Sequence, residues 1–383
     1  MKKAVVYGAG NIGRGFIGKI FHNSGYEVVF LDINMEVIDR LNQDKGYVVR
    51  TVSNKEEKNQ FIDNVRGVDG KDLNAVVNEI ATADIMATSI GVNILPYIIK
   101  NISEGIKARK RQDPLNIFLC ENLLHAAGYV NNLIEPFWEN TNVSEIKKKF
   151  SFVEVTIGCM IPALSKAEAK NNPTLVMVEP FCNLPVSKDM IIGPIPKLSN
   201  SEFISPFEIC EEEKLFIHNM SHALCSYFGY LKGYEYVWQA IDDNEIFFML
   251  KESLTSICFA ISEAYDANVK ELLNFSGCLL ERYKNKKLND PITRVGRDPF
   301  RKTDQNDRMV GAINRCKKQN KPYDLILKGI ACAMKFDVKE DSGVCKMKDM
   351  IEEKGIEGFL REHCKLDEQD VQKCKYYYNS IGL

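Results

Sequence analysis

Residues 4–18, AVVYGAGNIGRGFIG, decide the first half of the fold. A short apolar run enters three glycines at GxGxxG spacing, Gly8, Gly10 and Gly13, and residues with helical periodicity follow them. This order predicts a strand, a tight turn and a helix. Gly8 permits the turn, Gly10 lets a pyrophosphate approach the backbone, and Gly13 lets the helix pack against the strand. The N–H groups at the helix N-terminus then face the phosphates.

A second β-rich run, residues 26–31 (YEVVFL), ends in Asp32, nineteen residues after Gly13. A carboxylate at about this distance accepts hydrogen bonds from the adenosine ribose and repels a 2′-phosphate. The pattern therefore predicts NAD as the cofactor rather than NADP. The alternative is a glycine-rich turn with a surface aspartate in an unrelated α/β protein, but strand, glycines, helix, strand and acid all in register favour the dinucleotide.

Polar residues follow two later apolar runs, each of which predicts a buried strand. Residues 85–90 (IMATSI) lead into a loop over 88–93, and residues 115–119 (LNIFL) lead to Asn122. Loops at the carboxyl ends of parallel strands line the nucleotide crevice, although the first could be an ordinary strand-to-helix turn. Residues 151–156 and 175–179 are expected to extend the sheet. The candidate cofactor-binding residues are Gly8, Gly10, Asn11, Ile12, Gly13, Asp32, Asn34, Thr88 and Gly91.

The composition is that of a globular protein with two domains. The chain has 383 residues, 50 basic and 52 acidic, with a formal net charge of -2. Nothing in this balance indicates nucleic acid or a membrane as partner. The N-terminus runs directly into a strand, which leaves no room for a signal peptide and predicts a cytoplasmic protein. The segment 193–196 (GPIP) predicts the boundary between a Rossmann-like domain over 1–193 and a mainly α-helical domain over 194–383.

The 12 cysteines and five histidines show no metal-site spacing. No two cysteines are spaced CxxC, and most lie in apolar patterns, where a reduced thiol behaves as a small hydrophobe. His218 and His222 are four residues apart, but no carboxylate lies at a convincing spacing from them. The sequence therefore predicts no metal site.

A long helix predicted over 207–227 contains polar groups on one side. On the wheel of a regular α-helix, Lys214, Asn219 and His222 fall inside one arc. A lysine, an amide and an imidazole can thus converge on one small molecule, expected in a cleft between the domains. A buried lysine of lowered pKa can act as a base, and Asn219 with Asn122 can donate to a developing alkoxide. The alternative is a solvated lysine beside polar groups that satisfy the buried backbone.

A basic segment over 294–302 (RVGRDPFRK) follows further along the chain. Arginines around a glycine and a proline suit a phosphate or carboxylate, because each guanidinium can bind two oxygens at once. The alternative is a solvated loop that pairs with nearby aspartates. The candidate anion-binding residues are Arg294, Arg297, Arg301 and Lys302.

Five blocks together resemble the long-chain, polyol-specific mannitol dehydrogenase family. They are residues 4–18, LDIN at 31–34, CENLL at 120–124, KLFIHNMSHA at 214–223 and RVGRDPFRK at 294–302. The resemblance implies a zinc-independent, NAD-dependent enzyme, a monomer, that interconverts mannitol 1-phosphate and fructose 6-phosphate. It also implies Lys214 as general base, Asn122 and Asn219 as the alkoxide-stabilising pair, and His222 as a substrate-positioning residue. The basic segment then becomes a candidate for the sugar phosphate.

One departure from this family stands at Gly158-Cys159, where an Asp-Arg pair is usual. Two charged groups are thereby lost, which could weaken ligand binding or shift the substrate. Alternative functions are therefore a related polyol or hexuronate (tagaturonate/fructuronate-type) oxidoreductase and a non-catalytic NAD-binding sensor. The arginines disfavour a neutral polyol, and the retained Lys214, Asn219 and His222 disfavour a sensor.

Overall fold

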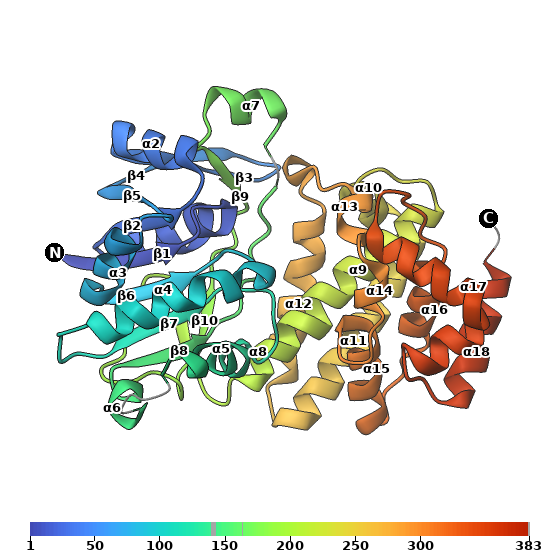
Figure 1. Cartoon of the computed structure of the whole chain (residues 1–383). Coiled ribbons are helices and arrows are strands. Elements are labelled where there is room, and N and C mark those ends of the chain that lie inside the picture. The colour runs from blue at the N-terminus through green and yellow to red at the C-terminus, as the bar shows by residue number, and fades with distance from the viewer. Residues whose placement is uncertain (139–142, 163, 382–383) are drawn as a thin grey trace. The chain divides into compact units, whose positions relative to one another are not determined.

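The computed structural model describes residues 1–138, 143–162 and 164–381. The chain forms two compact units, Met1–Phe207 and Glu208–Leu383 (Figure 1). Residues 193–196, where the sequence predicted a boundary, lie inside the first unit. They stay with it because β11 (Ser201–Ile204) returns to pair with β10 (Leu184–Ser187).

A six-stranded parallel sheet forms the centre of the first unit, with strand order β5-β2-β1-β6-β7-β8. Chain order reverses between β1 and β6, which makes this edge the topological switch point of a Rossmann-like sheet. The predicted fold class is confirmed. The strands are β1 (Lys2–Tyr7), β2 (Tyr26–Asp32), β5 (Val65–Asp69), β6 (Ile85–Thr88), β7 (Leu115–Leu119) and β8 (Phe150–Glu154).

Helices cover both faces of this sheet, which explains its continuous apolar strands. Alternate residues of β1 point to opposite cores: Ala4 and Val6 to one, Val5 and Tyr7 to the other. The first core is completed by η1 (Gly13–Gly18), α1 (Lys19–Asn23) and α2 (Met35–Asp44), and the second by α3 (Leu73–Thr82), α4 (Leu95–Ala108) and α5 (Ala126–Ile134). Shorter helices are η2 (Val92–Ile94), η3 (Glu135–Trp138), α6 (Val143–Lys147) and α7 (Lys166–Asn171).

A separate three-stranded sheet contains β3 (Gly46–Val52), β4 (Glu57–Asp63) and β9 (Val176–Val178). The prediction that residues 175–179 extend the main sheet is therefore wrong. The strand instead pairs in parallel with β3. There Val176 packs against the glycine-rich helix, where a Cβ on Gly15 would lie 2.6 Å from a Val176 methyl.

The second unit is helical, as predicted, and α9 (Met220–Leu231) is its most buried element. Nine of its 12 residues are buried, including the polar Ser221 and Ser226, which is the pattern of a helix surrounded by others. The remaining elements are α8 (Glu208–Glu212), η4 (Glu213–Asn219), α10 (Val237–Asp242), α11 (Asn244–Tyr265), α12 (Val269–Tyr283), η5 (Lys286–Leu288), α13 (Ile292–Gly296), α14 (Pro299–Lys302), α15 (Arg308–Lys318), α16 (Asp324–Ala333), α17 (Ser342–Glu362) and α18 (Glu368–Ser380).

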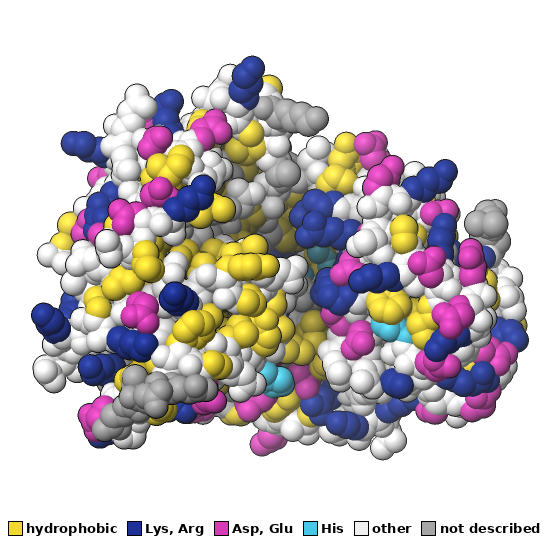
Figure 2. Space-filling model, in the orientation of Figure 1, with side chains coloured by type: hydrophobic (Ala, Val, Ile, Leu, Met, Phe, Trp, Pro, Cys, Tyr) yellow, Lys and Arg dark blue, Asp and Glu magenta, His cyan; other side chains and the backbone are white. Residues whose placement is uncertain are grey.

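The distribution of charged side chains and the state of the cysteines agree with what the composition predicted. Figure 2 shows basic and acidic side chains interspersed over the visible face of the helical unit. All twelve cysteines are free thiols. Among the described residues, no helix combines the length and apolar character that a membrane span requires.

Candidate active site

The candidate cofactor residues lie at one edge of the parallel sheet. In register, Tyr7 stands beside Leu31 on one side and Thr88 on the other, and Thr88 stands beside Leu119. The loops that follow β1, β2, β6 and β7 therefore all begin along one edge of the sheet. Because this edge includes the switch point, it is where an open α/β sheet binds its ligand.

The glycine-rich turn depends on two close approaches of the backbone. Gly8 has φ +106°, and a Cβ on it would lie 2.5 Å from the Ser89 carbonyl oxygen. A Cβ on Gly13 would lie 2.0 Å from the Gly8 carbonyl oxygen, so the helix can pack on the turn only with glycine there. Gly10 differs, because a Cβ on it would meet no atom within 4 Å. That open space suits a pyrophosphate.

Asp32 is held at the end of β2 beside this turn. Its Oδ2 atom accepts a hydrogen bond from the Ala9 N–H at 2.7 Å, and its Oδ1 atom accepts one from the Asn34 N–H at 2.9 Å. The Asn34 side chain caps α2 by accepting from the Val37 N–H at 3.4 Å. Asp32 thus provides a carboxylate that can accept hydrogen bonds from a ribose, and Gly10 leaves space for a phosphate after the neighbouring strand. This combination fits a dinucleotide.

The loops after β6 and β7 are joined by a carboxylate that sequence reasoning missed. Glu121 accepts from the Ile90 N–H at 3.1 Å and the Gly91 N–H at 2.7 Å. Gly91 has φ +90°, a conformation that favours glycine. Thr88 is fully buried and its hydroxyl has no hydrogen-bond partner, whereas Asn122 is exposed.

Arg14, directly after the third glycine, is a second residue that the motif did not single out. Its side chain is 5% exposed and donates to the Ala9 and Pro173 carbonyl oxygens, while its Nε atom has no partner. Burial lowers the pKa of this guanidinium, opposed by the nearby Tyr47 and Asp32. The arginine ties the turn to the loop before β9.

In the second unit, η4 is a π-helical segment inside the predicted long helix. The Met220 N–H donates to the Leu215 carbonyl five residues back. The wheel of a regular α-helix therefore does not apply here. In a π turn, residues five apart, such as Lys214 and Asn219, are successive neighbours along the axis. The structure thus places these two closer in angle than a regular α-helix would.

His218 is the side chain that lies next to Lys214. Its Nδ1 atom is 3.5 Å from the lysine Nζ atom, and the residue is 3% exposed. Burial, together with the cations Lys214, Arg282 and Arg308, holds the pKa of His218 well below its usual value. The imidazole is therefore neutral near pH 7. The i, i+4 spacing from Lys214 was the available sequence signal.

His222 stacks on Tyr283, with ring centroids 4.9 Å apart and planes at 13°. Its Nε2 atom lies 3.5 Å from Asp290 Oδ2, too far for a well-formed hydrogen bond, and this buried atom has no other partner. Burial lowers the pKa of His222, partly offset by Asp290. Asp290 is itself 6% exposed and pairs with Arg294 through Nε at 2.7 Å. Burial raises the pKa of Asp290, but His222 and Arg294 outweigh it, so the net shift is downward.

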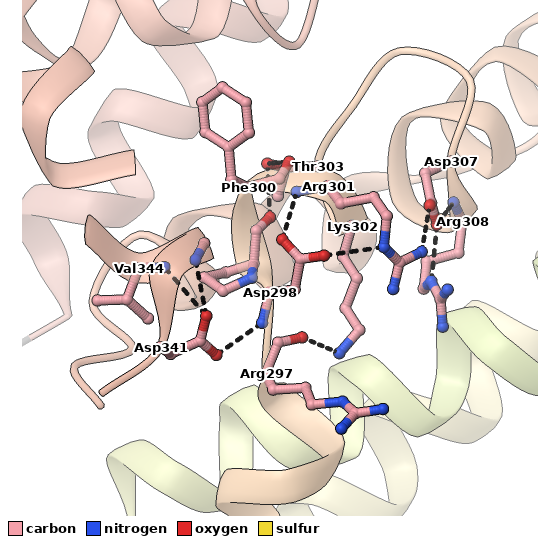
Figure 3. Close-up of polar contacts among 12 residues, drawn as sticks. Arg297, Asp298, Phe300, Arg301, Lys302, Thr303, Asp307, Arg308, Asp341 and Val344 are labelled. Atoms are coloured by element: carbon pink, nitrogen blue, oxygen red, sulfur yellow. Dashed lines mark hydrogen bonds and ion pairs between the residues drawn. The ribbon is translucent and has the colours of Figure 1, made fainter. Parts of the chain in front are cut away.

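The basic segment is already largely paired (Figure 3). Arg301 binds Asp298 at 3.0 Å and Asp307 at 2.8 Å, and Arg294 is committed to Asp290. Lys302 differs most from the prediction: it is 4% exposed, and its ammonium group donates to the Val295 and Arg297 carbonyl oxygens. Burial and the nearby Arg308 and Arg301 hold the pKa of Lys302 well below its usual value. An interior group of this kind is not presented to a substrate.

Arg297 contrasts with its neighbours. The residue is exposed, and Figure 3 shows no contact of its guanidinium with the other residues drawn. Its backbone is anchored instead, since its carbonyl oxygen accepts from the buried Lys302. Among the three arginines predicted as anion ligands, Arg297 is the one whose side chain is ion-paired with none of the described residues, since Arg294 and Arg301 both bind aspartates.

The departure at Gly158-Cys159 lies in the first unit, after β8. Cys159 is 9% exposed and belongs to the core that surrounds the glycine-rich helix. The next residue, Met160, donates its N–H to the buried Glu179 carboxylate at 2.5 Å. The thiol therefore serves as a small apolar core group at this position.

A Rossmann-like sheet with a glycine-rich turn and an acid at the end of β2, followed by a helical unit, is the architecture of an NAD-dependent oxidoreductase. Residues 2–200 match the mannitol dehydrogenase Rossmann domain, and residues 204–373 match the mannitol dehydrogenase C-terminal domain. The chain belongs to the mannitol dehydrogenase family, whose members are polyol oxidoreductases acting on a secondary alcohol.

Curated relatives extend over both units. The chain is 34% identical over 371 residues to mannitol-1-phosphate 5-dehydrogenase of Caldanaerobacter subterraneus subsp. tengcongensis, covering 96% of this chain and 95% of that protein. It is 33% identical over 370 residues to mannitol-1-phosphate 5-dehydrogenase of Clostridium acetobutylicum, with 96% and 95% covered.

Two solved structures share the fold at low sequence identity. A substrate-free D-sorbitol dehydrogenase gives a TM-score of 0.81 at 16% identity, covering 99% of this chain and 93% of that one. Pseudomonas fluorescens mannitol 2-dehydrogenase, in a ternary complex with NAD and D-mannitol, gives 0.74 at 15% identity, covering 99% and 92%.

Proposed function

We propose that this protein interconverts D-mannitol 1-phosphate and D-fructose 6-phosphate with NAD(H), without zinc, and with Lys214 as general base. The observation that carries the proposal is the match to relatives named mannitol-1-phosphate 5-dehydrogenase over 96% of the chain. The half-buried position of Lys214 supports it, because partial removal from water disfavours the charged form of an amine, and a base needs the uncharged form.

Bound NAD supplies the hydride acceptor. Lys214 Nζ takes the proton as the substrate O–H bond breaks in oxidation, and returns it in reduction. Asn122 and Asn219 donate hydrogen bonds to the oxygen as it becomes alkoxide-like. His222, fixed against Tyr283 with Asp290 beside its Nε2 atom, positions a neighbouring substrate hydroxyl.

Positive charge near His218 supports the proposal that no metal is needed. Lys214, Arg282 and Arg308 act on the His218 imidazole electrostatically, and their charge disfavours a dication there. We expect activity to be unchanged after dialysis against EDTA, with no zinc bound at stoichiometric level. Loss of activity that zinc restores would contradict the assignment.

The substrate phosphate is assigned to Arg297, with Arg301 and Arg294 as neighbouring positive charges and Lys302 as the anchor of the Arg297 backbone. An arginine with no competing carboxylate can bind two phosphate oxygens. Arg297→Ala should raise KM for fructose 6-phosphate at least 10-fold with little change in kcat. Arg301→Ala, whose side chain is paired with two aspartates, is the matched control and should change KM less than 3-fold.

The deciding experiment is NADH oxidation with fructose 6-phosphate and fructose offered in parallel at equal concentration. A strong preference for the phosphate supports the proposal. Activity with fructose alone identifies a polyol dehydrogenase, and activity with neither directs the search to hexuronates. A double-mutant cycle of Asn122→Ala and Asn219→Ala then tests whether the two amides act on one oxygen, since independent sites give additive effects.

A further inference from the structure

Lys214 does not stand alone on its helix, because His218 follows it within the π turn. The two side-chain nitrogens, Lys214 Nζ and His218 Nδ1, are 3.5 Å apart. This separation is long for a hydrogen bond, and catalytic hydrogen bonds in ligand-free enzymes are often long and tighten on binding. We propose that His218 is a positioning residue for Lys214, accepting a hydrogen bond through Nδ1 so that the lysine presents its reactive nitrogen in one orientation. The inference rests on Lys214 as the base.

The π turn that brings these side chains together is held by two side-chain hydroxyl groups, one from α12 and one from α9. The Tyr283 hydroxyl, from α12, donates to the His218 carbonyl oxygen at 3.0 Å. The Ser221 hydroxyl contacts the same carbonyl at 3.2 Å and the Ile217 carbonyl at 2.6 Å. Side chains thus satisfy carbonyl groups in the turn where regular α-helical bonding is interrupted.

The charges around His218 make it an acceptor. An imidazolium here would lie among cations in a buried site, which is unfavourable, and the pKa of His218 is lowered accordingly. A neutral imidazole has one nitrogen without a proton, and near an ammonium group that nitrogen is the acceptor. The groups that face the ring are Lys214 and His222 on its own helix, Arg282 and Tyr283 on α12, and Arg308 on α15.

This arrangement has a defined effect on proton transfer. When Lys214 is protonated, one N–H points to His218 and the others remain for the substrate oxygen. When the proton has left for that oxygen, an N–H can still point to His218, which directs the lone pair toward the product hydroxyl. A neutral acceptor also stabilises the charged lysine and so raises its pKa. Removing the acceptor should therefore lower the lysine pKa.

The test compares His218→Leu with His218→Asn in NAD-dependent oxidation of mannitol 1-phosphate. Asparagine can place its amide oxygen near the position of Nδ1, whereas leucine offers no acceptor. We expect His218→Leu to lower kcat at least 10-fold, with KM within 2-fold. The acidic limb of the kcat–pH profile should move to lower pH by at least 0.5 unit. His218→Asn should keep kcat within 3-fold of the parent, with the acidic limb of its kcat–pH profile at the same pH as in the parent enzyme.

Controls separate this inference from the proposed base. Lys214→Ala should abolish turnover, and if it does not, both assignments are overturned. If Lys214→Ala is inactive while His218→Leu keeps its kcat and its pH limb, only the inference fails. Should His218→Leu not fold, His218→Gln replaces it, because the longer amide reaches past the Nδ1 position. Equal activity of the Gln and Asn variants would then overturn the inference.

Discussion

The described residues form two π-helical segments, η1 and η4, one in each unit. Both contain predicted site residues, yet they serve different purposes. Segment η1 (GRGFIG) is buried throughout and contains three glycines, so it positions backbone. Segment η4 (EKLFIHN) presents Lys214 and His218 to one another, so it positions side chains. Widened turns of this kind are frequent at functional sites. The comparison shows why a motif search finds the first site readily and the second only in part.

The largest expected effect is that of replacing Gly13, the first residue of η1. Gly13→Ala would put a Cβ 2.0 Å from the Gly8 carbonyl oxygen, and this backbone contact cannot relax cheaply. We expect a loss of about 3 kcal/mol or more in the free energy of unfolding of the first unit. NADH binding should fall at least 100-fold, as measured by fluorescence titration.

Gly10→Ala is the matched control, since its Cβ would meet no protein atom within 4 Å. It should change stability by less than about 1 kcal/mol while still weakening NADH binding, because the methyl group occupies the phosphate approach. If both variants were equally stable, the view of η1 as a backbone-positioning device would be wrong.

A smaller effect is expected at Asp32. Asp32→Ala removes the acceptor of the Ala9 and Asn34 N–H groups and the repulsion of a 2′-phosphate. KM for NAD should rise about 10- to 100-fold, and the preference for NAD over NADP should fall by a similar factor. Asp69→Ala, at the register partner of Asp32 on β5, should leave the preference unchanged. An unaltered preference in Asp32→Ala would remove Asp32 from cofactor selection.

His218 in η4 and His222 in the first turn of α9 predict a pH dependence of stability. Both His218 and His222 have a lowered pKa in the folded state. Below about pH 6.5, their unfolded forms bind protons that the folded forms do not, so stability is lost as pH falls. Each contributes up to about 1.4 kcal/mol per pH unit until its native pKa is reached.

Urea unfolding between pH 7.5 and 5.5 measures this slope. Trp238 reports on the second unit when Trp138, in the first, is replaced by Phe. The slope of the free energy of unfolding against pH is proportional to the number of protons taken up on unfolding, and His218→Leu should reduce that number by up to one. A slope that stays the same in this variant would mean that His218 is protonated in the folded state, against the arrangement described for η4.

The smallest effect concerns the tyrosine that supports the π turn. Tyr283→Phe removes the hydroxyl that donates to the His218 carbonyl, at a cost of about 1–2 kcal/mol in stability. It should also shift the kcat–pH limb, because the turn that orients His218 loses its support. Tyr227→Phe is the control: its buried hydroxyl donates to the Gly296 carbonyl at 3.0 Å, so stability should fall by a similar amount with no shift of the limb. Identical kcat–pH profiles in the two variants would show that the support of the π turn by Tyr283 does not affect catalysis.

Sequence alone determined the Rossmann-like first unit, the glycine-rich turn, the acid at Asp32 and the helical character of the second unit. These features are local: a strand, a tight turn and a helix within fifteen residues impose backbone requirements that only particular residues meet at particular spacings. The resemblance to a known family added the activity that the site residues could not define by themselves.

Tertiary structure alone decided which residues far apart in the sequence come into contact. Val176 joins β3 instead of the main sheet, His218 contacts Tyr283 65 residues away, and His222 faces Asp290. Burial likewise separates Lys302, enclosed by carbonyl groups, from the exposed Arg297 five residues earlier. Partners so distant in the chain leave no periodic signal, and the helical wheel assumes an α-helix where the chain forms a π turn. Ion pairing and burial therefore follow from packing, which no short stretch of sequence specifies.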